Sequence, residues 1–216
     1  VQRRGKNILL DLSGGFTMHV HLRMTGNFYV IPDALFRPLS SSAWFTLDDG
    51  RGLLFQDQRG LGTLRIYDAE GRRKLVDSLG PEPLSRQFTA ARFLAAASAS
   101  RQPAKLFLMD QQRVAGLGNI YAAEALFAAQ VDPRQPMADV SQRQLRNLHQ
   151  TIVRILRDAV KSACIAYSRP GNFGEAEDYS PLVYGREGEA CMQCKRTIRR
   201  ISQGGRSTYY CPHCQR

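Results

Sequence analysis

The spacing of the cysteines near residue 200 constrains the fold more than any other feature of the sequence. Cys191 and Cys194 are separated by two residues, and after sixteen further residues Cys211 and Cys214 repeat that spacing. Two such knuckles, joined by a stretch long enough for a β-hairpin, are typical of a four-thiolate zinc site. We therefore expect these four cysteines to bind one structural Zn²⁺ ion. Four protein ligands would leave no coordination position for a catalytic water.

Two disulfides are the alternative role for the same cysteines. A fifth cysteine, Cys164, and the lack of a secretory apolar region after residues 1–6 argue against them. We expect Cys164, late in a predicted long helix, to be a small buried apolar residue. No apolar run is long enough to cross a bilayer, so the sequence predicts a soluble protein with a cytoplasmic location as the default.

The charge of the chain is strongly positive. Thirty Lys and Arg residues stand against nineteen Asp and Glu residues, and residues 189–216 alone hold six basic residues and one acid. This distribution predicts a polyanionic partner, with a merely basic surface as the alternative. Between the two knuckles, Gly204-Gly205 forms an expected turn that displays Arg206. Such a turn can contact a phosphate, or it can be an ordinary solvated hairpin turn.

The first third of the chain has the pattern of an antiparallel sandwich or barrel. Short β-type runs alternate there with clusters of Gly, Pro, Asp and Ser. We expect strands near residues 16–22, 28–31, 44–47, 53–55 and 64–67. Gly80-Pro81-Glu82-Pro83 then interrupts the chain, and the pattern becomes helical. The predicted domains are a β domain (1–67), a linker (68–83), a helical domain (84–188) and a zinc finger (189–216).

The helical part contains one segment whose glycines invite a functional interpretation. Helices are expected at 88–97 and 104–110, near Asn119, and after the N-cap candidate Ser141, where apolar residues recur at three- and four-residue spacings. Gly116-Leu117-Gly118-Asn119 lies between two of these helices. It can present backbone amides to an anion, or it can be an ordinary helix cap. Residues 167–188 are expected to form a long loop.

Taken together, four segments in this order resemble the formamidopyrimidine-DNA glycosylase family, with endonuclease VIII as its sister group. They are residues 1–6 (VQRRGK), residues 21–26 (HLRMTG), residues 108–110 with 116–121 (LMD and GLGNIY), and the cysteine knuckles with Arg206. The resemblance covers essentially the whole chain. It implies an α+β multidomain fold: an N-terminal antiparallel β-sandwich, incomplete here, a helical domain with a helix-two-turn-helix motif, and a C-terminal zinc-finger β-hairpin.

The resemblance also implies an activity. Members of this family bend duplex DNA, extrude an oxidised base and displace it with the amine of an N-terminal proline that is followed by a glutamate. The Schiff base then supports strand cleavage, so the family acts as a DNA glycosylase and as a lyase at abasic sites. Neither residue stands at the start of this sequence, so we expect the chain to begin inside the sandwich. It should bind damaged DNA as a monomer without normal catalysis.

Three alternatives remain open at this point. One is a non-catalytic zinc-finger DNA-binding protein derived from the same family. Another is an endonuclease VIII-type glycosylase for oxidised pyrimidines. A zinc-ribbon module for protein interactions is the third, and it explains residues 189–216 but not the matches at Lys6, Met24 and Asn119.

Site residues follow from the resemblance, position by position. Lys6 matches a lysine that contacts phosphate and donates a proton in the first elimination, and Arg206 matches the arginine assigned to the second elimination. Three further positions, His21, Lys105 and Asn119, match residues implicated in DNA contact. Lys6 and His21 could also be ordinary surface residues.

The space left by the extruded base is filled, in relatives, by a methionine, an arginine and a phenylalanine. Met24 and Arg59 match the first two, but Leu61 stands in place of the aromatic residue. Leucine can fill volume without ring stacking, which leaves the opposite-base preference open. The loop 168–181 matches the family's cap over the extruded base, and its sequence does not reveal which oxidised base is preferred.

Overall fold

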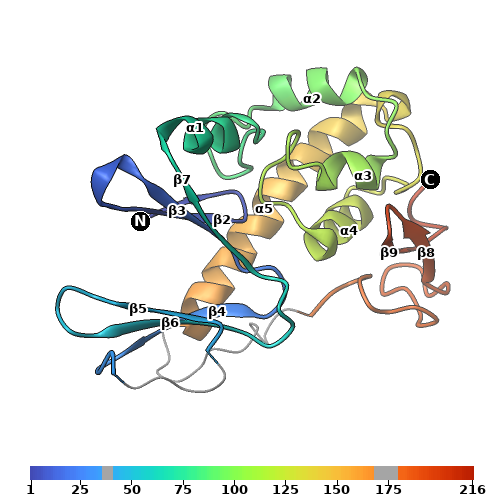
Figure 1. Cartoon of the computed structure of the whole chain (residues 1–216). Coiled ribbons are helices and arrows are strands. Elements are labelled where there is room, and N and C mark those ends of the chain that lie inside the picture. Colours follow the sequence, from blue (N-terminus) through green and yellow to red (C-terminus); the bar gives the residue numbers. More distant parts are fainter. Residues whose placement is uncertain (36–40, 168–179) are drawn as a thin grey trace. The chain divides into compact units, whose positions relative to one another are not determined.

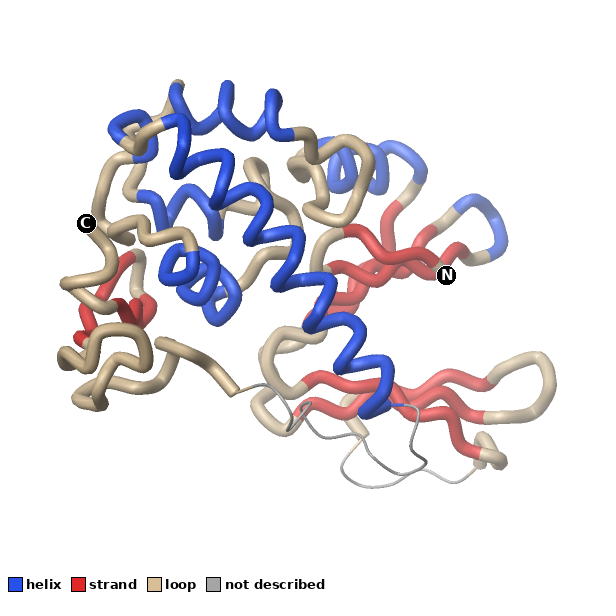
Figure 2. The backbone as a smooth tube through the Cα atoms, turned by 180° about the vertical axis from the view of Figure 1, so that it is seen from behind, coloured by secondary structure: helices blue, strands red, loops and turns tan. Residues whose placement is uncertain are grey.

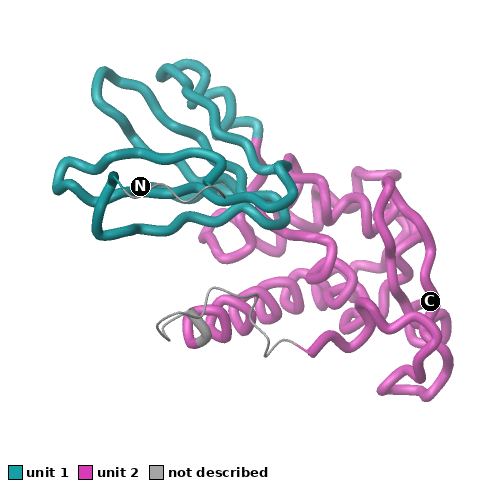
Figure 3. Tube along the Cα trace, turned by 60° about the horizontal axis from the view of Figure 1, so that its bottom comes forward, with its two compact units in different colours: residues 1–78 teal, residues 79–216 magenta. Residues whose placement is uncertain are grey.

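The computed structural model describes residues 1–35, 41–167 and 180–216, and at helix residues 166 and 167 it describes the backbone alone. The chain divides into two compact units, residues 1–78 and residues 79–216, which Figure 3 shows in two colours. Each unit has its own core and is described by itself. The capping loop predicted at 168–181 lies almost wholly outside the described residues.

Two antiparallel sheets form the first unit (Figure 1). One sheet has the order β1-β2-β3-β7, and the other has the order β4-β6-β5. The strands are β1 (Gln2–Arg4), β2 (Asn7–Asp11), β3 (Thr17–His21), β4 (Gly26–Ile31), β5 (Ala43–Thr46), β6 (Gly52–Asp57) and β7 (Thr63–Tyr67). A short 3₁₀ turn, η1 (Ser13–Gly15), joins β2 to β3. The predicted antiparallel β architecture is confirmed.

Apolar side chains from both sheets meet in one core. Met18, Val20 and Phe55 are buried there, and the rings of Phe28 and Phe55 lie 5.2 Å apart between centroids. Burying a side chain of this size stabilises the fold by about 1.5–3 kcal/mol. The β-type runs read from the sequence are therefore the strands whose apolar residues fill the space between the sheets.

Two connections cross from one sheet to the other at the same end of the strands. β3 pairs with β7, where His21 lies opposite Thr63, and β4 pairs with β6, where Gly26 lies opposite Asp57. The turn from β3 to β4 and the turn from β6 to β7 therefore begin and end beside each other. This topology makes the two turns neighbours although about 35 residues separate them.

Helix α1 (Ala69–Asp77) ends the first unit. Its N-cap is Asp68, whose side chain accepts a hydrogen bond from the amide of Gly71 at 2.7 Å. An N-cap aspartate satisfies an amide that has no partner within the helix. The segment predicted as a linker thus contains a capped helix, and the domain boundaries at 67 and 83 stay predictions.

The second unit is built around the long helix α5 (Gln142–Tyr167), which Figure 2 shows running beside the shorter helices. Its apolar face buries Leu145, Leu148 and Ile152 completely. Ser141 caps it as expected, because its Oγ accepts from the amide of Gln144 at 3.3 Å. The other helical elements are α2 (Ala90–Ser98), α3 (Ala104–Met109), α4 (Asn119–Ala128) and the 3₁₀ turn η2 (Met137–Asp139).

The cysteine-rich segment forms the predicted β-hairpin of β8 (Arg199–Gln203) and β9 (Arg206–Tyr210). Gln203 pairs with Arg206, so Gly204 and Gly205 alone make the turn. Both have positive φ, at 56° and 71°. A two-residue turn with two positive φ angles matches the twist of a hairpin, and glycine adopts it without steric cost.

One local prediction is wrong. Cys164 is exposed, not buried. It lies in the last two turns of α5, where neighbouring residues such as Ile165 are exposed as well. Amphipathic spacing identifies the apolar face of a helix, but it does not tell where the covering core ends. Among the described residues, no helix is long and apolar enough to span a membrane.

Candidate nucleic-acid interface and metal centre

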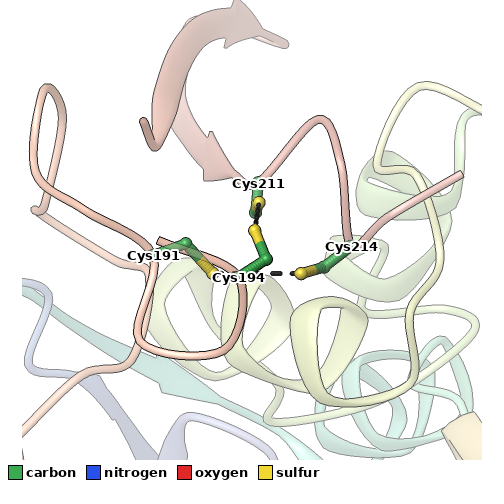
Figure 4. Close-up of side chains that lie close together, drawn as sticks. All are labelled: Cys191, Cys194, Cys211 and Cys214. Atoms are coloured by element: carbon green, nitrogen blue, oxygen red, sulfur yellow. Dashed lines mark hydrogen bonds between the residues drawn. The ribbon is translucent and has the colours of Figure 1, made fainter. Parts of the chain in front are cut away.

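The four cysteines of the knuckles converge on one point (Figure 4). All four Sγ atoms lie within 4.8 Å of one another, and two of the separations are 3.9 Å (Cys191 to Cys214) and 3.5 Å (Cys194 to Cys211). A tetrahedral site with Zn–S bonds of about 2.3 Å requires sulfur separations near 3.8 Å. The donor set and its geometry therefore fit a structural zinc ion, which would cross-link the two knuckles.

The zinc-binding segment packs against the helical core of the same unit. Cys191, Cys211 and Ile198 share a buried cluster with Ala123 and Phe127 of α4. A buried glutamine, Gln215, adds polar contacts: its Oε1 accepts from the amide of Cys211 at 2.8 Å, and its Nε2 donates to the carbonyl of Val131 at 2.9 Å. The zinc finger is thus attached to its neighbour by apolar and polar contacts together.

Arg206 stands exposed at the tip of the hairpin. The tip is supported from below, because a Cβ on Gly204 would lie 2.9 Å from Cδ2 of Leu106 in α3. The side chain of Gln203 donates to the carbonyl of Pro133 at 3.2 Å. The glycine turn therefore permits close approach to α3 on one side while Arg206 remains accessible on the other.

Lys105 lies beneath this hairpin. Its side chain is 1% exposed, and its Nζ donates to Oγ1 of Thr208 in β9 at 3.3 Å. Burial, and then the positive charge of Arg206, lower the pKa of Lys105 to about 8. The position matched to DNA contact is thus occupied by a buried lysine that supports β9, and direct contact with DNA stays a prediction.

Asn119 begins α4, as the sequence predicts. Its Nδ2 donates to the carbonyl of Ser207 in β9 at 3.1 Å and lies 3.3 Å from the hydroxyl of Tyr184. Its Oδ1 is buried and has no hydrogen-bond partner among the described residues. The side-chain amide thus links the helix-two-turn-helix segment to the zinc hairpin, and its contact with phosphate stays a prediction.

Two polar side chains that the sequence did not single out fix the backbone of residues 182–184 and of the turn before α4. Glu124, 2% exposed, accepts hydrogen bonds from the amides of Leu182, Val183 and Tyr184 at 2.8–2.9 Å. The Gln111 side chain accepts from the amide of Gly116 at 2.8 Å and donates to the carbonyl of Leu117 at 3.0 Å. A lone acid within the apolar run of α4 was the available signal for Glu124.

In the first unit, the carboxylate of Asp57 joins the two neighbouring turns. It accepts from the hydroxyl of Thr25 at 2.5 Å on the β3–β4 turn, and from the amides of Arg59 (3.3 Å) and Gly62 (2.5 Å) on the β6–β7 turn. The Thr25 hydroxyl and the Gly62 amide hold the pKa of Asp57 below its usual value. One buried side chain therefore fixes both loops.

The three residues predicted to fill the vacated base position project from these turns. Met24 is 65% exposed and Leu61 is 47% exposed, and Arg59 is exposed as well. Arg23, next to Met24, has a φ of 56°. A non-glycine residue in this region costs about 1–3 kcal/mol and is frequent at functional sites. The structure thus brings Met24, Arg59 and Leu61 together on one edge of the sandwich.

Lys6 and His21 also belong to this unit. Lys6 lies exposed in the two-residue turn between β1 and β2. His21 ends β3, and its pKa is lowered by burial first and then by the charges of Arg23 and Lys6. These charges favour a neutral imidazole, whose Nδ1 accepts from the amide of Arg23 at 3.1 Å. His21 therefore supports the backbone of the Met24 turn.

A β-sandwich, a helical unit with a two-turn connection before α4, and a four-cysteine hairpin define the class of zinc-finger DNA glycosylases. Models of three domains match the chain in succession: the formamidopyrimidine-DNA glycosylase N-terminal domain at residues 1–64, its helix-two-turn-helix domain at 79–168, and a zinc finger found in this enzyme and in isoleucyl-tRNA synthetase at 188–216. The chain belongs to the formamidopyrimidine-DNA glycosylase family.

Individual relatives are similar to this chain over nearly its whole length. The enzymes of Chloroflexus aurantiacus and Chloroflexus aggregans are 37% and 40% identical over all of it, which spans 78% and 79% of their lengths. The crystal structure of the Thermus thermophilus protein has a TM-score of 0.83 at 36% identity and covers 99% of this chain and 81% of its own. A complex of the Lactococcus lactis protein with DNA containing FAPY-dG has a TM-score of 0.85 at 30% identity, with 99% and 80% covered.

Proposed function

We propose that this chain acts in base-excision repair by binding, as a monomer, duplex DNA that contains an oxidised base or an abasic site. The observation that carries the proposal is the group of exposed side chains on the two turns fixed by Asp57. Met24 and Leu61 present apolar surface to solvent beside the exposed cation of Arg59, on a chain with a net charge of +11. Apolar side chains that enter a base step offset part of the few kcal/mol that unstacking costs.

Contacts with phosphate would supply the affinity. Arg206 offers an exposed guanidinium on a supported tip, and Lys6 and Arg59 offer exposed cations in the first unit. Asn119 and Lys105 are held by contacts within the protein, so we assign them a positioning role for the hairpin in addition to the DNA contact that the resemblance implies. His21 would position the Met24 turn in the same way.

The chemistry that we propose is that of a glycosylase with an associated lyase activity. It requires an amine that attacks C1′ of the sugar, so that a C–N bond forms as the bond to the base breaks. In the family this amine belongs to a proline that precedes a glutamate. A polypeptide of these 216 residues has no such pair at Val1, so it should bind lesion DNA without forming the Schiff base.

Borohydride trapping tests this assignment. The 216-residue polypeptide and a version extended upstream to a Pro-Glu start would each be mixed with abasic duplex and reduced. We expect a covalent adduct with the extended version alone. An adduct with the short polypeptide that disappears in Lys6→Ala would show that Lys6 supplies the amine, because a lysine beside other cations can lose its proton. An adduct with neither would favour the non-catalytic DNA-binding alternative.

A binding comparison tests the role of the exposed apolar residues. Met24→Ala should reduce the preference for abasic over intact duplex about ten-fold, because its contact exists only when a base has left the stack. Arg206→Ala should weaken binding to both duplexes alike, since phosphates carry no information about the lesion. The same loss of preference in both variants would contradict this division of roles.

A further inference from the structure

A polar pocket lies on the zinc finger, at the end of the hairpin away from the tip. Its cavity is about 420 Å³ and is lined by Arg196, Thr197, Arg199, Pro212, His213 and Arg216. Arg199 is the first residue of β8 and pairs with Tyr210, whereas Arg206 pairs with Gln203 at the other end. Four residue steps along a strand separate the two ends by about 13 Å. The pocket is therefore distinct from the tip that carries Arg206.

The arginines of this pocket have no acidic partner in the part of the chain that the structure describes. Arg196, Arg199 and Arg216 form no side-chain hydrogen bond or ion pair there. Their neighbours differ: Arg200 pairs with Glu187 at 2.6 Å, and Arg186 pairs with Glu189 at 2.8 Å. The acids of this segment thus neutralise other arginines, and the positive charge is concentrated around the cavity.

Concentrated positive charge costs free energy unless an anion offsets it. A guanidinium presents a planar fork of N–H donors that matches two oxygens of a phosphate, and such charge-assisted bonds are about twice as strong as neutral ones. Thr197 adds a hydroxyl, which can donate to a further oxygen. We propose that this pocket binds a phosphate group.

Two sources could supply that phosphate. One is the backbone of the duplex that the chain binds, and in that case the inference rests on the proposed function and adds a second phosphate contact to the zinc finger. The other is a free phosphate ester. The chemistry recognised by the arginines is the same for both, so the experiment needs one arm for each source.

The test uses the zinc-loaded protein and an Arg196→Ala/Arg199→Ala double variant. Arg200→Ala is the matched control, because it removes an arginine from the same strand that is already paired with Glu187. In the first arm, pyrophosphate is titrated and the side-chain N–H and amide signals of residues 196–199 are followed by NMR. We expect saturable shifts in the wild type and in Arg200→Ala, and at least ten-fold weaker binding in the double variant.

In the second arm, the affinity for a 25-base-pair abasic duplex is measured at several salt concentrations. Each phosphate contact contributes about 0.9 to the slope of log K against log salt. If DNA is the source, the double variant should lower this slope by about 2, and Arg200→Ala should change it by less than about 0.5. A slope unchanged in the double variant, with pyrophosphate still bound by the wild type, would assign the pocket to a free phosphate ester.

Failure of the inference and failure of the proposed function give different results. Pyrophosphate that shifts no pocket signal, together with an unchanged salt slope, would overturn the inference even if the protein binds abasic DNA normally. Pyrophosphate bound by a protein that shows no affinity for abasic DNA would overturn the proposed function and leave the pocket standing. If the double variant does not fold, an Arg196→Glu variant with normal zinc content replaces it in both arms.

Discussion

The two sets of exposed side chains are held in different ways. Arg206 stands on a hairpin whose support comes from distant parts of the chain: the four cysteines, Lys105 and Asn119. Met24, Arg59 and Leu61 stand on two turns whose shared support is one carboxylate, that of Asp57 on the adjacent strand β6. The position of Arg206 thus depends on tertiary assembly of the second unit. The positions of Met24, Arg59 and Leu61 depend on hydrogen bonds of one carboxylate to two turns that connect the two sheets.

Removal of zinc should produce the largest effect, centred on the hairpin and on the side chains that pack against it. Structural zinc contributes apparent free energies on the order of 10 kcal/mol, and a segment of this size buries little apolar surface by itself. We expect chelation to abolish amide protection in β8 and β9 while α5 stays protected, because the core around Leu145, Leu148 and Ile152 contains no cysteine ligand. Hydrogen exchange with native mass spectrometry measures both. If DNA affinity were unchanged without metal, the proposal that Arg206 depends on the zinc-supported hairpin would be wrong.

Glu124→Gln should come next in size. The carboxylate is buried and accepts three backbone amides, and an amide side chain would turn a donor toward donors. Leaving buried groups unsatisfied costs about 1–3 kcal/mol, and more for a charged group. Urea unfolding, followed by a spectroscopic probe in the second unit, measures the loss in the free energy of unfolding. The matched control is Glu189→Gln, which breaks an exposed ion pair with Arg186 and should cost less than about 1 kcal/mol.

Lys105, which lies beneath the hairpin, makes the free energy of unfolding depend on pH. Its pKa in the folded chain is about 8, below the ordinary 10.5. Below pH 8 the folded and unfolded chains both hold the proton, so this group adds no slope. Between pH 8 and 10.5 the unfolded chain holds a proton that the folded chain has lost, and the free energy of unfolding rises with pH. Lys105→Met should remove this rise, at most about 3 kcal/mol. Identical pH profiles for variant and wild type would contradict the buried position.

Asp57→Asn should have the smallest effect on stability and a selective effect on recognition. The folded-state pKa of Asp57 lies below its usual value, so its contribution is present above pH 4 and is lost as the pH falls through the folded pKa. Denaturation between pH 2 and 6 should show a flatter profile for the variant. Preference for abasic duplex should fall as well, while affinity for intact duplex stays within about two-fold. An equal loss on both duplexes would show that the turns support general binding.

The sequence predicted those parts that depend on local pattern. The cysteine spacing identified the zinc ligands, alternation and turn residues identified the strands, and Ser141 marked the start of α5. These features are visible because the residues involved lie within a few positions of one another. The resemblance to a family added the candidate residues, and Met24, Arg59 and Leu61 do lie together in the structure.

The parts that were missed depend on contacts between distant residues. Glu124 bonds to amides about 60 positions away, and Asn119 reaches a carbonyl 88 positions away. Asp57 reaches Thr25 across 32 positions. No local pattern reports such partners. The prediction that Cys164 is buried was wrong for a related reason. Elements elsewhere in the chain determine how far along α5 the core extends.

Because Asp57 bonds to the hydroxyl of Thr25 and to the main chain of the β6–β7 turn, the path of that turn does not depend on the side chain at position 61. Leucine can therefore stand there in place of an aromatic residue without redirecting the backbone. Residues 24, 59 and 61 are exposed positions on a backbone that Asp57 holds, so we expect substitutions there to leave the path of the two turns unchanged. Substitution libraries at these three positions, with Asp57 and Thr25 retained, would test the prediction that they influence the opposite-base preference.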